Sequence, residues 1–278
     1  IDFCNSKNIN VSAVIKGFNG LTSIVKLLNK SDTKWIASSR IQQLIESKNI
    51  GVNKPLMLIR MPMLSEIPDV IKYCDISLNS ELETVMKLNN EAKKQGVVHK
   101  IIIMYDVGDL REGIFYKKDI ISICKYIENN LNSIKLFGIG TNLSCYGSVL
   151  PTEDNMQKLV DVAEEIESKI GRKLEIISGG ATTSIPLAYQ NKMPMRINHL
   201  RLGEAIFCSQ DLPKFMNTKI KNTSGNAFIL KAEIIEINSK PTYPIGELGV
   251  NAFGDKPASQ EFDIRKLAIL AIGNQDLG

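Results

Sequence analysis

Eight short runs of apolar, often β-branched residues alternate with segments of helical periodicity through most of the chain, and this alternation limits its fold more than any other feature. It is typical of repeated strand–helix units that build a parallel sheet. The expected strands cover residues 11–15, 34–37, 56–60, 75–78, 100–106, 135–140, 173–178 and 199–202. Eight such units in about 200 residues predict an α/β fold, a (β/α)8 barrel of the TIM type.

An open, doubly wound sheet is the alternative fold. Such a sheet normally carries a glycine-rich fingerprint directly after its first strand. Residues 17–20 read Gly-Phe-Asn-Gly, which is too sparse for that fingerprint, so the barrel is favoured.

The clearest predicted helix covers residues 152–170. Its apolar residues recur on one face, Thr152 suits the N-cap, and Gly171 can adopt the left-handed conformation that ends a helix. Segments 80–95 and 119–130 show similar patterns.

The character of the chain changes after about residue 212. Segments 228–237, 242–245 and 264–272 are strand-like, they are separated by Pro and Gly turns, and helical periodicity disappears. We therefore predict a barrel domain over residues 1–212 and a mainly β domain over residues 213–278. Because the chain starts at Ile1 and stops directly after an apolar run, we expect the β domain to be partial.

Charge and cysteine content argue against several classes of protein. The net charge of +4 is mild and both signs are interspersed, which favours a mixed surface and no nucleic-acid partner. The five cysteines include no C-x-x-C pair, so a disulfide framework and a zinc site are disfavoured and a reducing cytoplasm is expected. No apolar run approaches the roughly 20 residues that span a bilayer. We expect no membrane partner and no metal.

Functional residues of such a barrel collect at the carboxyl ends of its strands. Lys16 follows the first expected strand, where burial would lower its pKa and make it an amine nucleophile. From position alone, a solvated surface lysine is the more common outcome. Arg111 follows the fifth strand, where a loop salt bridge with Asp109 or Glu112 is the plain alternative.

Asn142 and Cys145 follow the sixth strand. Their small side chains suit contact with a ring face or a phenolic oxygen, although a simple loop with one buried thiol fits equally well.

The seventh strand ends in the sequence Ser178-Gly179-Gly180-Ala181-Thr182-Thr183-Ser184, and the eighth supplies Arg201-Leu202-Gly203. Small residues and hydroxyls before a helix present backbone N–H groups to an anion, and barrels often bind phosphate after strands seven and eight. These segments predict a phosphate site.

Taken together, these residues resemble the alanine racemase N-terminal barrel family, and most closely its ornithine racemase branch. The resemblance covers nearly the whole chain, and it is most specific in the stretches 76–84, 106–113, 140–147, 197–205 and 252–254. It implies a racemase that uses pyridoxal 5′-phosphate (PLP) as its cofactor.

On this resemblance, Lys16 forms the Schiff base with PLP and transfers protons on one face of it. Arg201 matches the arginine that donates to the pyridine nitrogen, and Arg111 matches the one that reaches the phenolic oxygen. Asn142 also belongs to the cofactor site. The phosphate-binding positions are Ser178, Gly179, Gly180, Thr182 and Gly203.

Two departures from the family pattern concern catalysis. Met104 stands where alanine racemases have a lysine, often carbamylated, that supports the strand-five arginine. Glu247 replaces the tyrosine that serves as the second base. Glu247 is either that base, a ligand for the distal ammonium group of a cationic substrate, or a plain turn residue. Cys145 and Tyr146 are alternative second bases.

The resemblance implies a homodimeric enzyme that interconverts L- and D-ornithine, or a related basic amino acid, by two-base proton transfer. Three alternatives are an alanine racemase, a PLP homeostasis protein without robust catalysis and a cofactor-free phosphate-binding barrel. The β segment disfavours the homeostasis protein. A metal-dependent D-threonine aldolase is disfavoured because His99 and His199 both lie outside that segment.

Overall fold

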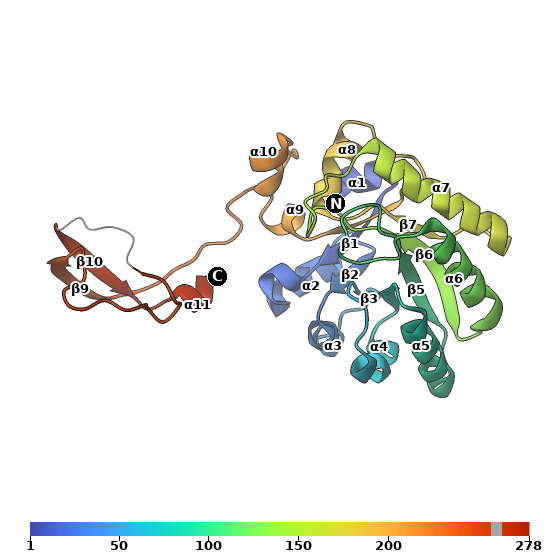
Figure 1. The fold of residues 1–278 in the computed structure, drawn as a ribbon, viewed down its shortest axis with the longest axis horizontal. Coiled ribbons are helices and arrows are strands. Elements are labelled where there is room, and N and C mark those ends of the chain that lie inside the picture. The colour runs from blue at the N-terminus through green and yellow to red at the C-terminus, as the bar shows by residue number, and fades with distance from the viewer. Residues whose placement is uncertain (257–262, 278) are drawn as a thin grey trace. The chain divides into compact units, whose positions relative to one another are not determined.

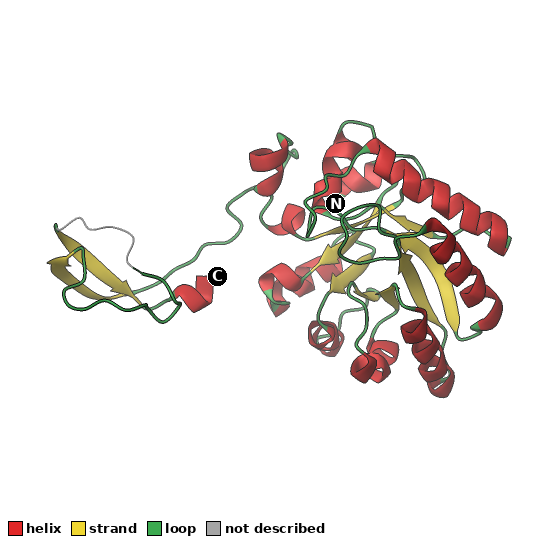
Figure 2. Ribbon diagram, viewed as in Figure 1, coloured by secondary structure: helices red, strands yellow, loops and turns green. Residues whose placement is uncertain are grey.

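The computed structural model describes residues 1–256 and 263–277. Residues 1–227 form a first compact unit, in which helices surround a closed barrel of parallel strands (Figures 1 and 2). The strands follow the chain order around the barrel: β1 (Asn10–Val14), β2 (Trp35–Ser38), β3 (Leu56–Leu58), β4 (Ile76–Asn79), β5 (His99–Met104), β6 (Ile134–Gly140), β7 (Ile176–Ser178) and β8 (His199–Leu202). The predicted TIM-type barrel is confirmed.

The first and last strands of the barrel pair with each other. Asn10 of β1 lies opposite His199 of β8, while Ser12 of β1 lies opposite Trp35 of β2. β1 therefore has a neighbour on each side, and this closure excludes the open, doubly wound alternative.

Helices or short 3-10 turns lie between consecutive strands. The helices of this unit are α1 (Asp2–Ser6), α2 (Thr22–Lys30), α3 (Ile41–Asn49), α4 (Ile67–Tyr73), α5 (Leu82–Gln95), α6 (Lys117–Asn130), α7 (Glu153–Ile170), α8 (Ile185–Tyr189), α9 (Glu204–Phe207) and α10 (Asp211–Met216). The 3-10 turns are η1 (Lys16–Phe18), η2 (Leu64–Glu66) and η3 (Thr182–Ser184).

α7 shows why the sequence specifies these helices. The Thr152 hydroxyl accepts the Asn155 N–H at 3.2 Å, and the Asn155 side chain accepts the Thr152 N–H at 2.8 Å. Gly171 ends the helix with a φ of 75°, a conformation that side chains disfavour. The predicted caps are confirmed, and the cap at Thr152 contributes about 1 kcal/mol.

Buried apolar side chains fill two spaces around the sheet. Ala13 and Ile15 point outward and pack against the helices, whereas Val14 between them belongs to the cluster inside the barrel. β6 passes so close to β7 that a Cβ on Gly138 would lie 2.0 Å from the Ile176 carbonyl oxygen. Parallel strands place all their carboxyl ends at one mouth of the barrel, so the loops after the strands meet there.

Residues 228–278 form the second compact unit. It contains the antiparallel pair β9 (Ile234–Pro241) and β10 (Ile264–Leu270), followed by α11 (Asn274–Leu277). The expected strand at 228–237 begins six residues later, and 242–245 lies outside both strands. Pro241 pairs with Ile264 at the end of β9, and the Thr242 N–H still donates to the Asp263 carbonyl oxygen at 2.9 Å. The ladder ends directly after this bond, and Pro244 has no N–H with which to continue it.

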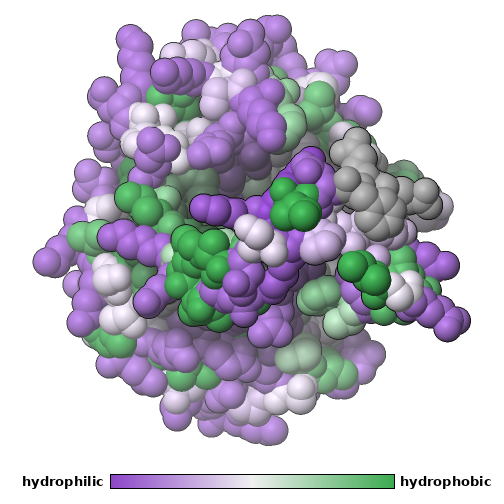
Figure 3. Space-filling model, turned by 90° about the vertical axis from the view of Figure 1, so that its left-hand side faces the viewer, coloured by the Kyte–Doolittle hydropathy of each residue, from purple (hydrophilic) through white to green (hydrophobic). Residues whose placement is uncertain are grey.

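Two further expectations concern the surface and the region after residue 212. Helical structure continues to Met216 in α10, so the expected loss of helical pattern at 212 was placed a few residues early. Hydrophilic residues cover much of the face shown in Figure 3, with apolar side chains in small groups among them. Within residues 1–256 and 263–277, no helix is both long and apolar enough to span a bilayer.

Candidate active site

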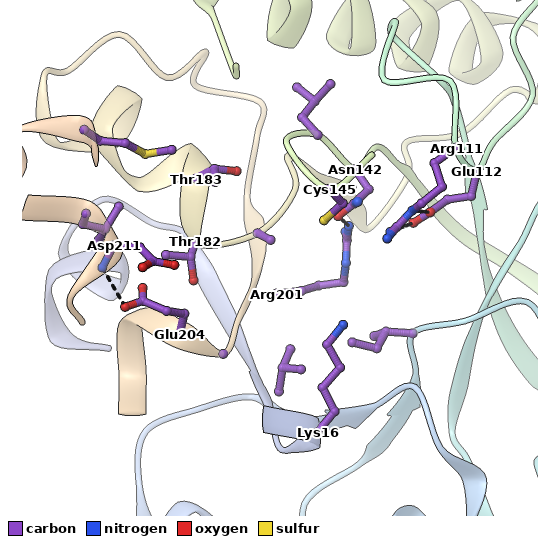
Figure 4. Close-up of a pocket in the computed structure, with 17 residues that line it drawn as sticks. Lys16, Arg111, Glu112, Asn142, Cys145, Thr182, Thr183, Arg201, Glu204 and Asp211 are labelled. Atoms are coloured by element: carbon purple, nitrogen blue, oxygen red, sulfur yellow. Dashed lines mark hydrogen bonds and ion pairs between the residues drawn. The ribbon is translucent and has the colours of Figure 1, made fainter. Parts of the chain in front are cut away.

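A cavity of about 240 Å³ lies among the segments that follow β1, β3, β5, β6, β7 and β8 (Figure 4). This volume is somewhat below the range of about 300–1,000 Å³ that is typical of small-molecule sites. Charged, polar and apolar side chains all contribute to its lining: Val14, Lys16, Ile59, Arg111, Glu112, Asn142, Leu143, Cys145, Ala181, Thr182, Thr183, Arg201, Gly203, Glu204, Asp211, Leu212 and Met216.

Lys16 points into this cavity from the start of η1 (Figure 4). Of the two states that the sequence left open, a buried amine and a solvated lysine, the structure shows an exposed Lys16 side chain at the cavity. Ile15 is the last buried residue of this segment, and the chain turns directly after it, which lifts Lys16 out of the strand. None of the ion pairs found in the described part of the chain involves Lys16. Its amine therefore lies free at the cavity.

Arg201 enters the same cavity from β8 and is buried. Its Nη1 donates to the Ser178 hydroxyl at 2.5 Å, and its Nη2 donates to the Thr141 carbonyl oxygen at 2.8 Å. Burial lowers the pKa of Arg201 to about 10, so the guanidinium stays charged at neutral pH. These bonds fix its position at the inner wall of the cavity.

A chain of hydrogen bonds continues from Arg201 into the barrel. Because a guanidinium only donates, the Ser178 oxygen must accept from Arg201, which leaves its O–H to donate to His199 Nδ1 at 2.8 Å. His199 Nε2 then donates to the Ser12 hydroxyl at 2.7 Å, and Ser12 donates to the Met57 sulfur at 3.7 Å. Burial lowers the pKa of His199 to about 3, in agreement with the neutral ring that this chain requires. Both ring nitrogens of His199 therefore have a hydrogen-bond partner.

Arg111 and Glu112 reach the cavity from the loop after β5 and form an ion pair. Arg111 Nη2 donates to Glu112 Oε1 at 2.8 Å, and Arg111 Nε donates to Glu112 Oε2. The structure thus forms one of the two salt bridges that the sequence left open, while keeping Arg111 at the cavity. Met104, in the position where relatives were expected to carry a lysine, is buried inside the barrel.

Asp109 joins the loop after β5 to the loop after β6. Its buried carboxylate accepts the N–H groups of Ser144 at 3.1 Å, Tyr146 at 3.1 Å and Val149 at 3.3 Å. Burial raises the pKa of Asp109, but these backbone donors outweigh it and hold the pKa below its usual value. The bonded loop carries Cys145, so Asp109 sets where that thiol stands.

The predicted site residues fall into three groups. The structure brings seven of them to one cavity: Lys16, Arg111, Asn142, Cys145, Thr182, Arg201 and Gly203. Ser178, Gly179 and Gly180 lie outside the lining, and the Ser178 hydroxyl is used by Arg201 and His199. Glu247 belongs to the second unit, so its role stays a prediction.

Several lining residues escaped the sequence reasoning. From the sequence, Glu112 was expected only as a salt-bridge partner for Arg111 without a role of its own, and Glu204 and Asp211 were not among the predicted site residues. Glu204 Oε1 accepts the N–H groups of Gln210 at 2.6 Å and Asp211 at 3.1 Å, so it caps the start of α10. The signal that was available for Glu112 was its place next to an arginine in a loop at the barrel mouth.

The comparison with protein families decides where this barrel belongs. The family model described as "Alanine racemase, N-terminal domain" matches residues 4–211. The chain belongs to the alanine racemase family. This confirms the predicted family, and with it a PLP-dependent amino acid racemase as the class of enzyme.

Two curated relatives match almost the whole chain. An ornithine racemase of Acetoanaerobium sticklandii is 42% identical over 275 residues, which cover 99% of this chain and 76% of that protein. A lysine racemase of Thermotoga maritima is 34% identical over 277 residues, which cover 100% of this chain and 76% of that protein.

Solved structures share the fold of this chain. An alanine racemase of Clostridium difficile in complex with cycloserine superposes with a TM-score of 0.61 at 21% identity, covering 74% of this chain and 57% of that one. PipY of Synechococcus elongatus, solved with PLP bound, gives a TM-score of 0.60 at 14% identity, covering 72% of this chain and 92% of that one.

The residues around the cavity fit PLP. Three cationic side chains, those of Lys16, Arg111 and Arg201, line one space, and PLP carries a phosphate and a phenolic oxygen that need such partners. The side-chain nitrogen of Asn142 and the hydroxyl of Thr183 are buried there without a protein partner in the described part of the chain. Buried donors of this kind are normally satisfied, so they suit a polar ligand.

Proposed function

We propose that this protein racemises basic amino acids, with ornithine as its main substrate and with PLP held at Lys16. The observation that carries the proposal is the convergence of Lys16, Arg111 and Arg201 on one cavity at the carboxyl ends of the barrel strands. The substrate assignment is supported by the two relatives that match almost the whole chain, an ornithine racemase and a lysine racemase.

Each of these side chains has a defined task in the proposal. When bound, PLP withdraws electrons from the α-carbon of an amino acid and so makes its proton acidic. Lys16 holds the cofactor through Nζ and moves the α-proton on one face. Arg111 donates toward the phenolic oxygen, while Thr182 and the backbone after Gly203, where α9 begins, receive the phosphate.

Arg201 controls the outcome of the reaction in this proposal. Its guanidinium donates toward the pyridine nitrogen but keeps its own proton, because its pKa of about 10 lies well above neutral pH. With PLP bound, an arginine that keeps its proton would leave the ring nitrogen unprotonated, and the weaker electron withdrawal would favour return of a proton over transamination.

A second acid–base group must act on the opposite face. In Figure 4, Lys16 and Cys145 lie on opposite sides of the end of Arg201. Cys145 is an exposed thiol at the cavity, and it is the second base that the geometry of the barrel supports. Glu247 and a homodimeric assembly stay predictions from the sequence.

The test combines cofactor labelling with a racemisation assay. The protein is incubated with PLP, its visible absorption spectrum is recorded, borohydride is added, and the labelled peptide is mapped. We expect the label on Lys16, conversion of L-ornithine to D-ornithine, and loss of both in Lys16→Ala. Lys26→Ala, which changes an exposed lysine on α2, is the matched control.

Three outcomes would change the proposal. A label on another lysine would remove Lys16 from its role. PLP binding without racemisation of ornithine, lysine or alanine would favour the homeostasis protein. Racemisation of alanine alone would retain the reaction and replace the substrate.

A further inference from the structure

Glu112 is an acidic side chain of the cavity that the proposed chemistry leaves without a task. It lies beside Arg111 in the loop after β5 and lines the same space as Lys16 and Arg201 (Figure 4). Two parallel hydrogen bonds join its carboxylate to the Arg111 guanidinium, one from Nη2 and one from Nε. Such a fork fixes the plane of the guanidinium as well as its position.

The backbone that carries this pair is held at both ends. The Ile114 N–H donates to the Met104 carbonyl oxygen at 2.9 Å, and the Asp106 N–H donates to the Ile114 carbonyl oxygen at 3.1 Å. Gly113 closes the loop with a φ of 118°, and a Cβ there would lie 2.7 Å from the Asp106 nitrogen. The loop therefore has little freedom, and the remaining freedom of Arg111 lies in its side chain, which Glu112 restrains.

The charges around the cavity give Glu112 a second effect. Arg111 and Arg201 lie close enough for the charge of Arg111 to disfavour the charged form of Arg201. Glu112 acts in the opposite direction on both, because its carboxylate favours the charged guanidinium of each. Only 18% of the Glu112 side chain is exposed, so water screens this attraction less than it would on an open surface.

We propose that Glu112 is a positioning residue, which holds Arg111 in the place and plane that the phenolic oxygen of the cofactor requires. This inference rests on the proposed function, because it assumes that PLP occupies the cavity. Glu112 itself does not need to touch the substrate, since both of its carboxylate oxygens already accept from Arg111.

The first test measures PLP binding by Glu112→Gln, which needs no turnover. A glutamine keeps one acceptor oxygen but turns an N–H donor toward the Arg111 donors, so the fork is lost. We expect the Kd for PLP to rise about tenfold or more and kcat for L-ornithine to fall by a similar factor, the size expected for losing a hydrogen bond to a charged group. Glu112→Asp keeps the charge and should restore part of both.

The matched control is Glu83→Gln, which removes an exposed carboxylate that pairs with Lys87 on α5. It should leave the Kd, kcat and KM unchanged. Thermal unfolding of each variant without PLP shows whether it is folded. If Glu112→Gln is not folded, the Kd and kcat of Glu112→Asp are compared with those of the wild-type protein instead.

A double-mutant cycle with Arg111→Lys separates positioning from direct contact with the substrate. Lysine cannot form the fork, so Glu112→Gln should change the Kd for PLP by less than about threefold in that background. If the Kd of the double variant instead rises by the product of the two single-variant factors, the positioning role is overturned and contact between Glu112 and the substrate ammonium group is favoured. Glu112→Gln with wild-type affinity and kcat would overturn it as well.

The two proposals fail differently. A wild-type protein that binds no PLP overturns the proposed function and the positioning role together. Wild-type binding and racemisation with an unaffected Glu112→Gln variant overturn the positioning role alone.

Discussion

Two buried histidines make the stability of the barrel depend on pH at the scale of single residues. His99 begins β5 with its Nε2 at 2.9 Å from the Ser77 hydroxyl, and His199 begins β8 between Ser12 and Ser178. Burial lowers the pKa of His99 to about 4 and that of His199 to about 3. Both rings are therefore neutral in the folded protein at pH values where an unfolded chain would bind a proton.

We predict that the free energy of unfolding falls as the pH is lowered from 7.5 to 5.0. An unfolded histidine titrates near 6.5, so the stability from the neutral rings is complete above that pH and is lost as the pH falls toward 4 and 3. The expected loss by pH 5.0 is on the order of 1–2 kcal/mol for each histidine. Urea unfolding at three pH values measures it.

A His99→Gln variant provides the comparison, because it should show a smaller loss over the same range. Equal stability of the wild-type protein at pH 7.5 and 5.0 would contradict the prediction, since most exposed carboxyl groups titrate below this range.

Site residues at the carboxyl end of a strand could be predicted from the sequence, whereas others could not. Lys16 and Arg201 follow from counting strands, because parallel strands bring their ends together. The contacts of Ser178 could not be foreseen, because they depend on its pairing with His199 across two strands. Glu112 was also undervalued, since loop residues carry no periodicity that shows which way they point.

At the scale of elements, the eight strands were predictable because each is a short apolar run between helices with recognisable ends. The errors lie in the second unit, where apolar residues no longer report burial. β9 and β10 are exposed along their whole length, so neither period nor burial marks where they begin and end. Pro244 was the physical signal that the ladder would not continue through residues 242–245.

Asp109 gives a prediction that concerns two elements at once. In Asp109→Asn, the new NH2 group faces either the Ser144 and Val149 N–H groups or that of Tyr146, so at least one partly buried donor loses its acceptor. We expect the free energy of unfolding to fall by about 1–3 kcal/mol. We also expect iodoacetamide to alkylate Cys145 at a different rate, because the loop that holds the thiol is released.

Cys208 is the internal control for that experiment, because it is exposed but lies in a different segment. Peptide mapping by mass spectrometry gives both rates from one sample. An unchanged ratio of Cys145 to Cys208 labelling, with unchanged urea unfolding, would show that Asp109 does not tie the two loops together.

At the scale of the molecule, stability is concentrated in the first unit. Its core includes fully buried Ile, Leu and Val side chains on almost every strand and helix, and each contributes about 1.5–3 kcal/mol when buried. In the second unit, the structure describes two strands. Their apolar side chains are largely exposed, and Ile264, for example, has 72% of its surface accessible to solvent. A two-stranded sheet has little independent stability in water.

This difference predicts where a protease cuts first. Residues 217–233 contain no helix or strand, they are largely exposed, and they include Lys219, Lys221 and Lys231. Limited trypsin digestion of the native protein should therefore cleave in this segment before it cleaves in the barrel, because cleavage needs a locally extended backbone.

Mass spectrometry over time should show a stable fragment that begins at residue 1 and ends near residue 221. A urea-unfolded sample, cut throughout, is the control. First cuts at Arg111 or Lys117 would instead show that the loop after β5 opens more readily than residues 217–233.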